Sequence, residues 1–232
     1  MTRIRLELTK GLAVRYISHL DYSRALERAF RRAKLPVAYS EGFNPHMKVA
    51  FASALAVGVT SDAEYMDVEL VDKMDLAAIQ ECLAGQMPPG IAIKQVKYVD
   101  IHAPALMAIV NLAHYRIIVP VAENTSPADI ERSMEQFKTA AEIPYTRISP
   151  KGKREINIKQ FLGGDMTAVV ADQTIELSFD IRITPTGSIK PGEVLDALVT
   201  FFKLPVRQDG AAIHRTGLFI ADGTLRQSPM DL

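Results

Sequence analysis

The sequence of 232 residues contains a single cysteine, Cys82, and no run of eighteen apolar residues. One cysteine cannot form a disulfide within the chain or supply an all-cysteine zinc or iron–sulfur site. Because Cys82 lies in a segment with apolar periodicity, we expect it to be a small core residue. The sequence also lacks a charged leader followed by an apolar segment, so we expect a cytoplasmic protein with no membrane partner.

Net charge is absent as well, because 27 lysines and arginines balance 27 aspartates and glutamates. The total therefore gives no argument for a polyanionic partner, but the distribution does. Residues 1–60 hold ten basic and four acidic residues, whereas residues 61–110 hold three basic and eight acidic ones. This asymmetry predicts a polarised surface.

Several catalytic signatures are also missing. The sequence has no zinc-type spacing, nucleotide-binding glycine fingerprint, Walker loop or serine elbow. The carboxylates of residues 62–75 alternate along a predicted strand, which is typical of an exposed edge and not of a catalytic pair. We therefore expect no cofactor on this chain and no catalysis by this chain alone.

Hydrophobic periodicity predicts the order strand, helix, strand, strand, helix, strand twice. The first set lies at residues 3–8, 18–34, 49–54, 64–71, 75–87 and 91–99, and the second at residues 114–121, 126–141, 155–161, 174–183, 191–202 and 212–221. Two βαββαβ patterns predict an α+β fold of two tandem ferredoxin-like units with antiparallel sheets. The expected domains are residues 1–103 and 112–232, and a single mixed α+β domain is the alternative.

The first predicted helix is strongly basic on one side. Its apolar stripe consists of Tyr22, Leu26, Ala29, Phe30 and Ala33, and its remaining surface carries Arg24, Arg28, Arg31, Arg32 and Lys34. Only Glu27 is spaced to pair with one of these cations, Arg31. Because arginine binds phosphate bidentately, the pattern favours a surface that tracks a phosphate backbone. The alternative is a solvated face whose arginines pair with the acidic residues 62–75.

Two neighbouring features extend this candidate site. Arg15, Ser18 and His19 lie at the expected helix start, where free N–H groups and the helix dipole favour an anion. The following loop contains Gly42, Phe43, Asn44, His46 and Lys48, a composition typical of a loop with a fixed shape that binds something. His19 and His46 are also candidate acid/base groups. Alternatively, His19 packs under the loop, Phe43 plugs the core and His46 is merely exposed.

The second half has a smaller cluster of cations at Lys151, Lys153, Arg154 and Lys159. It lacks the interleaved aromatic residues of a single-strand stacking platform, so Lys153 and Arg154 are candidates for RNA backbone contacts only. The turn at residues 184–188, before the last predicted helix, is a further candidate for holding one phosphate.

Two motifs flank the basic helix: Arg-Tyr-Ile-Ser-His-Leu-Asp at residues 15–21 and Tyr-Ser-Glu-Gly-Phe-Asn-Pro-His at residues 39–46. In these motifs and the helix, the chain resembles the radical SAM-linked (radical SAM-associated) family. The resemblance continues through residues 51–64 and at Lys-Arg-Glu-Ile-Asn-Ile, residues 153–158, so it covers most of the chain. Met47 departs from the family pattern, where proline is frequent, which affects the expected shape of the loop.

Members of that family are bacterial proteins of unestablished function that lie beside, or fused behind, a radical SAM protein with a cobalamin-binding-type domain. They often occur near genes for ribosome and RNA processing. The resemblance thus implies a radical SAM partner and not an activity of this chain, and we expect the pair to act in RNA modification. A radical SAM cluster needs three cysteines, so the iron–sulfur cluster and SAM are expected on the partner.

The leading hypothesis is a non-catalytic RNA-binding accessory module that presents a structured RNA, either tRNA or rRNA, to that partner. Its expected RNA contacts are Arg15, Ser18, His19, Arg24, Arg28, Arg31, Arg32, Gly42, Phe43, Asn44, His46, Lys48, Lys153 and Arg154. One alternative is a metal-independent ribonuclease of RAMP-like type that uses His19 or His46. The other is a protein-interaction module that docks on the radical SAM partner.

Overall fold

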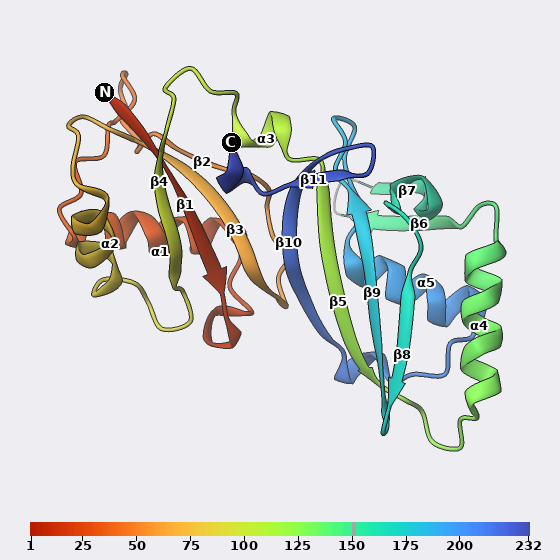
Figure 1. Ribbon diagram of the computed structural model, residues 1–232. Helices are drawn as coiled ribbons and strands as arrows, with labels where there is room; N and C mark the ends of the chain where they lie inside the picture. Colours follow the sequence, from red (N-terminus) through yellow and green to blue (C-terminus); the bar gives the residue numbers. More distant parts are fainter. Residues whose placement is uncertain (150–151) are drawn as a thin grey trace. The chain divides into compact units, whose positions relative to one another are not determined.

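The structure, a computed structural model, describes residues 1–149 and 152–232, and it is mixed α+β with mostly antiparallel strands (Figure 1). This confirms the predicted α+β class. The chain forms two compact units, one of Met1–Asn111 with Arg215–Leu232 and one of Leu112–His214. Lys151, which belongs to the predicted second cationic cluster, lies outside the described residues.

The first unit is built on an antiparallel sheet with the strand order β4-β1-β3-β10. Its elements are β1 (Thr2–Lys10), a 3-10 turn (Leu12–Val14), α1 (His19–Arg32), β2 (Val49–Phe51), β3 (Val59–Leu70), α2 (Leu76–Ala84), β4 (Ile93–Val99), α3 (Leu106–Ile109), β10 (Ala212–Asp222) and β11 (Leu225–Gln227). Strand β2 pairs with β3, and β11 pairs with β10. In Figure 1, α1 and α2 cover one face of the β1 to β4 region.

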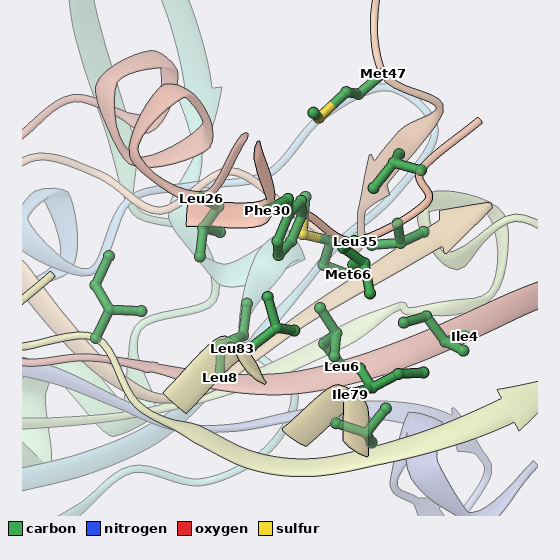
Figure 2. Close-up of a cluster of buried hydrophobic side chains, with 14 of the residues drawn as sticks. Ile4, Leu6, Leu8, Leu26, Phe30, Leu35, Met47, Met66, Ile79 and Leu83 are labelled. Atoms are coloured by element: carbon green, nitrogen blue, oxygen red, sulfur yellow. The ribbon is translucent and has the colours of Figure 1, made fainter. Parts of the chain in front are cut away.

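Strand alternation explains the core of this unit. Residues Ile4, Leu6 and Leu8 of β1 lie on the face that α1 and α2 cover, and all three are fully buried. Figure 2 shows them beside Leu26 and Phe30 of α1 and Ile79 and Leu83 of α2. Cys82 packs at the edge of this cluster, as predicted.

The opposite face of the sheet carries a buried ion pair beside buried side chains such as Tyr65. Arg5 of β1 is 1% exposed and bonds both carboxylate oxygens of Asp67 of β3, at 2.7 and 3.0 Å. Its third contact is the carbonyl oxygen of Pro229, at 2.7 Å, in the C-terminal segment. The acidic residues 62–75 were predicted to form an exposed edge, and this was wrong for Asp67, because β3 lies inside the sheet between β1 and β10.

The second unit has the strand order β5-β9-β8 and two helices, α4 and α5, that contact one another. Its elements are β5 (Leu112–Pro120), α4 (Pro127–Thr139), β6 (Pro144–Ser149), β7 (Gly152–Asn157), a 3-10 turn (Ile158–Phe161), β8 (Thr167–Ala171), β9 (Thr174–Arg182), α5 (Pro191–Phe202) and a 3-10 turn (Gln208–Gly210). Strands β6 and β7 form a separate hairpin sheet. A bidentate ion pair from Arg147 to Glu193, with both distances 2.6 Å, joins this hairpin to the start of α5.

Most predicted elements are present, with changes at their ends. The strand predicted at residues 155–161 ends at Asn157, whose side-chain oxygen accepts from Lys159 N and turns the chain into a 3-10 helix. Strand β2 also ends earlier than predicted, at Phe51. The strands β6 and β8 and the helix α3 were not predicted. The assignment of residues 1–103 and 112–232 as separate domains stays a prediction; in the structure, Arg215–Leu232 groups with the first unit.

Candidate nucleic-acid interface

The start of α1 is closed by its own side chains. Ser18 is the N-cap, as predicted: its hydroxyl oxygen accepts from Asp21 N at 3.1 Å and donates to Asp21 Oδ2 at 2.7 Å. Asp21 therefore already places a negative charge at the positive end of the helix dipole. Arg15 lies nearby and donates through Nε to Gly58 O at 2.6 Å. The donors predicted to bind an anion at this helix start, Arg15 and Ser18, thus already form hydrogen bonds to Gly58 and Asp21.

A buried ionic cluster lies beneath this helix start. Arg215 of β10 is 0% exposed and donates through Nε and Nη2 to Glu64 Oε1, with the Nε distance at 3.0 Å, and through Nη1 to Ser53 at 3.1 Å. Lys10 is also buried and donates to Ile17 O at 3.1 Å. Burial lowers the pKa of Lys10 from its ordinary value, the Glu64 carboxylate opposes that shift, and Arg215 adds to it.

This cluster was missed in the sequence, although a signal for it exists. Lys10 follows Ile4, Leu6 and Leu8 at the same strand phase, and Glu64 precedes Met66 and Val68 at theirs. A charge in phase with buried apolar residues indicates a buried ion pair. Arg215 carries no such local signal, because it comes to Glu64 from 151 residues away.

His19 lies partly buried over the same cluster. Its ring meets Phe51 of β2 edge-on, with ring centroids 4.8 Å apart. Burial lowers the pKa of His19; the Glu64 carboxylate opposes this, and the cations of Arg215 and Lys10 reinforce it. The lowered pKa of His19 favours the neutral imidazole, which has one donor and one acceptor nitrogen, so its structural and its acid/base role both stay predictions.

The arginines of α1 form an exposed stripe. Arg24, Arg28 and Arg31 follow the spacing i, i+4, i+7 and are all exposed. Arg24 lies 3.7 Å from Asp21, and Arg31 lies 3.9 Å from Glu27. Arg28 forms no ion pair or hydrogen bond with any other described residue. This stripe is the strongest positive feature of the helix.

The alternative in which these arginines pair with the acidic residues 62–75 is wrong within the described part of the chain. Glu64 and Asp67 pair with Arg215 and Arg5, and Glu69 contacts Lys48 at 3.4 Å. Arg32 instead donates to the Gln86 backbone oxygen at 2.6 Å and to its side chain at 3.2 Å, beyond the end of α2. Three carboxylates of the acidic segment thus have cationic partners outside α1, and none of these ion pairs joins this segment to the helix stripe.

The loop of residues 40–46 is closed at its base. Ser40 N donates to His46 O at 2.9 Å, His46 N donates to Ser40 Oγ at 3.1 Å, and the same hydroxyl lies 2.8 Å from His46 Nδ1. Gly42 has φ +115°, which side chains other than glycine rarely adopt. Phe43 is fully exposed at 105%, so the alternative in which it plugs the core is wrong.

The helix start and the loop lie at different levels of the sheet. His19 contacts Phe51, which pairs with Met66, whereas Lys48 at the loop base contacts Glu69. Three strand residues separate these levels, roughly 10 Å along β3. The helix start and the loop base therefore contact β3 at different positions along the strand, and His19 and His46 both stay candidates.

The second unit brings together two candidates that the sequence offered separately. Arg154 of β7 and Thr186 of the turn at residues 184–188 line one surface pocket of about 400 Å³, together with Asn157 and Phe161. Lys153 is exposed on the same strand. In the part of the chain that the structure describes, no group of three or more histidine, cysteine, aspartate or glutamate side chains is placed to hold a metal ion. No helix there combines the length and the apolar character needed to cross a membrane.

These features define a mixed α+β protein with an antiparallel sheet and an exposed cationic helix stripe. Residues 3–191 match the family described as "Uncharacterized protein conserved in bacteria (DUF2344)", and the chain belongs to that family. The match confirms the predicted membership in a bacterial family of unestablished function, while the radical SAM linkage stays a prediction. No curated protein matches the chain.

Among solved structures, the chain is similar over 100% of its length to a chain of a Cbf5–Nop10–Gar1 complex, at 11% identity and a TM-score of 0.54, and it spans 53% of that chain. It is also similar to a chain of an archaeal box H/ACA sRNP Nop10–Cbf5 complex, covering 92% of this chain and 46% of that one, at 10% identity and a TM-score of 0.44. A third similarity is to a RAMP protein binding different RNA substrates, over 78% of this chain and 87% of that one, at 10% identity and a TM-score of 0.24. The first likeness shows a shared fold alone, and the other two carry no argument about this chain.

Proposed function

We propose that the chain is a non-catalytic RNA-binding accessory module of two tandem ferredoxin-like units, which presents a structured tRNA or rRNA to a radical SAM partner enzyme. The iron–sulfur cluster and SAM belong to that partner in this proposal. The βαββαβ element order of residues 2–99 supports the ferredoxin-like part. The genomic setting of the resembling family supports the partner.

The observation that carries the RNA-binding part is the exposed stripe of Arg24, Arg28 and Arg31. Like charges at i, i+4 repel one another and destabilise an isolated helix slightly. The nearest carboxylates satisfy Arg24 and Arg31 only at 3.7 and 3.9 Å, and Arg28 has no partner among the described residues. A row of phosphates would relieve this repulsion, and arginine suits phosphate because its N–H groups bind two oxygens at once.

The test reverses charges on this stripe. We expect Arg24→Glu with Arg28→Glu to weaken binding of a bulk tRNA or rRNA fragment and to reduce the slope of log affinity against log salt by about 0.7–0.9 per lost phosphate contact. Fluorescence anisotropy at several salt concentrations measures both quantities. The matched control is Arg132→Glu on α4, an arginine that is also exposed and also lies beside an aspartate at i, i+3. Unchanged affinity and slope in the α1 variant would contradict the proposal.

A second candidate function, docking on the radical SAM partner, is favoured by a different observation. Four apolar side chains near the helix start are more than half exposed: Leu12, Tyr16, Leu20 and Val57. They lie in two segments of the chain, and hydrogen bonds between Arg15 and Gly58 join these segments. Exposed apolar residues that gather in this way are typical of protein interfaces. Co-purification of the two proteins that survives RNase but is abolished by the α1 reversals would favour docking over RNA binding.

A further inference from the structure

The fully exposed ring of Phe43 has no use inside the protein. Its relative exposure of 105% means that no neighbouring atom covers it, although burial of a phenylalanine side chain stabilises a folded protein. A loop that merely connects two segments favours polar residues at its tip. An aromatic ring at the tip of an otherwise polar loop is therefore a candidate contact for another molecule.

The loop fixes the backbone that carries this ring before any such contact forms. The three Ser40 and His46 interactions close the base of the loop, and Gly42 gives the chain its sharp turn directly before Phe43. A preformed loop loses little conformational entropy when it binds, so most of the contact energy appears as affinity. Such a loop positions one aromatic face rather than a broad apolar surface.

Resting on the proposed RNA-binding function, we propose that Phe43 stacks on an unpaired base, so that the RNA which this protein binds has an accessible single-stranded nucleotide beside a phosphate backbone that the α1 arginines contact. Every base has a planar face that an aromatic ring can stack on. A base inside an A-form helix is stacked between its neighbours, so only loops, bulges and ends offer a free face. The substrate class is thus a structured RNA with a bulge or loop, not a continuous duplex.

The charges around the loop fit an RNA contact of this kind. Lys48, at the loop base, contacts Glu69 at 3.4 Å. Glu41, beside Gly42, is the exposed acid of the loop. A phosphate next to the stacked base would be attracted by Lys48, whereas Glu41 would repel it. Neutralising Glu41 is therefore expected to raise RNA affinity without changing which RNA is preferred.

The experiment compares two RNA hairpins that differ only in one bulged 2-aminopurine nucleotide. We expect the wild-type protein to bind the bulged hairpin about tenfold more tightly than the blunt one and to quench the 2-aminopurine fluorescence. Phe43→Ala is expected to lose both the preference and the quenching while its salt slope stays unchanged. Phe43→Tyr keeps both, and the matched control Glu41→Gln keeps the preference.

The outcomes separate this inference from the proposed function. If Phe43→Ala keeps the preference for the bulged RNA, base stacking is overturned, and a contact of Phe43 with a protein partner replaces it. If the wild type binds both hairpins equally and without quenching, the inference is overturned while the α1 arginine test still stands. If the α1 reversals leave RNA binding unchanged, the proposed function fails instead. The thermal midpoint of Phe43→Ala should equal that of wild type, because the ring contacts nothing in the folded protein.

Discussion

Burial decides what the charged residues beneath α1 are able to do. Lys10, Glu64 and Arg215 are at most 2% exposed, and together with the partly buried His19 they carry more positive than negative charge. Burial lowers the pKa of both Lys10 and His19 and raises the pKa of the Tyr22 hydroxyl well above its usual value. The arginines on the outer face of α1 are exposed instead, so a ligand is able to reach them. Location thus separates structural cations from binding cations.

His19 makes a prediction about pH. Its folded pKa lies below the unfolded value of 6.5, so between these two values the unfolded chain binds more protons. The free energy of unfolding therefore rises with pH through that window. As the pH falls below 6.5, the unfolded chain binds a proton at His19 before the folded protein does, and the folded protein loses stability. We expect His19→Gln to lose less stability than wild type between about pH 7 and about pH 5, as measured by urea denaturation. The exposed His46→Gln is the control, and a His19 variant that matches wild type at every pH would contradict the expectation.

Contacts between elements distant in the sequence hold the first unit together. Strand β3 receives Arg5 from β1 on one face and Arg215 from β10 at Glu64, and both guanidinium groups are buried. Local elements were easier to predict than these contacts. The N-caps Ser18, Asp75 and Ser126 are local features of this kind, because a cap depends on residues two or three positions away. Strand β8 was missed, because all five of its residues are exposed and show no alternation.

The ion pair between β3 and β10 gives a prediction at the scale of elements. Glu64→Gln leaves Arg215 buried without a counter-charge, and we expect a loss of about 3–5 kcal/mol in the free energy of unfolding. The double variant Glu64→Leu with Arg215→Met removes both charges and is expected to recover most of that loss. Asp72→Asn, at an exposed position, serves as the control and should change stability by less than about 0.5 kcal/mol. Equal stabilities of the single and double variants would show that the charges are not coupled.

The C-terminal segment Arg215–Leu232 belongs to the first unit. Residues after His214 supply Arg215 to Glu64, the Pro229 carbonyl to Arg5 and the Met230 carbonyl to Lys97, the last at 2.6 Å. Each of these contacts joins segments more than 130 residues apart. The first unit is thus discontinuous in the sequence, because it includes Arg215–Leu232 as well as Met1–Asn111.

Truncation tests this dependence. A chain that ends at His214 leaves Arg5 and Glu64 without their C-terminal partners, and we expect residues 1–111 to lose cooperative unfolding and to become sensitive to limited proteolysis. The full-length Arg215→Lys variant, which keeps the charge but not the forked geometry, should fall between wild type and the truncation. Native-like melting and protease resistance of residues 1–111 in the truncated chain would contradict the prediction.

The sequence by itself determined the α+β class, the position and caps of the main helices, the basic stripe of α1 and the unusual composition of the loop at residues 40–46. These features depend on residues two to four positions apart, because the backbone geometry of a strand or a helix brings such residues to the same face or the same helix end. Only the tertiary structure decided which groups pair with the buried charges, that Phe43 is exposed and that Arg215 completes the first unit. Those outcomes depend on strand pairing across more than a hundred residues and on solvent access, and neither is encoded in the local pattern.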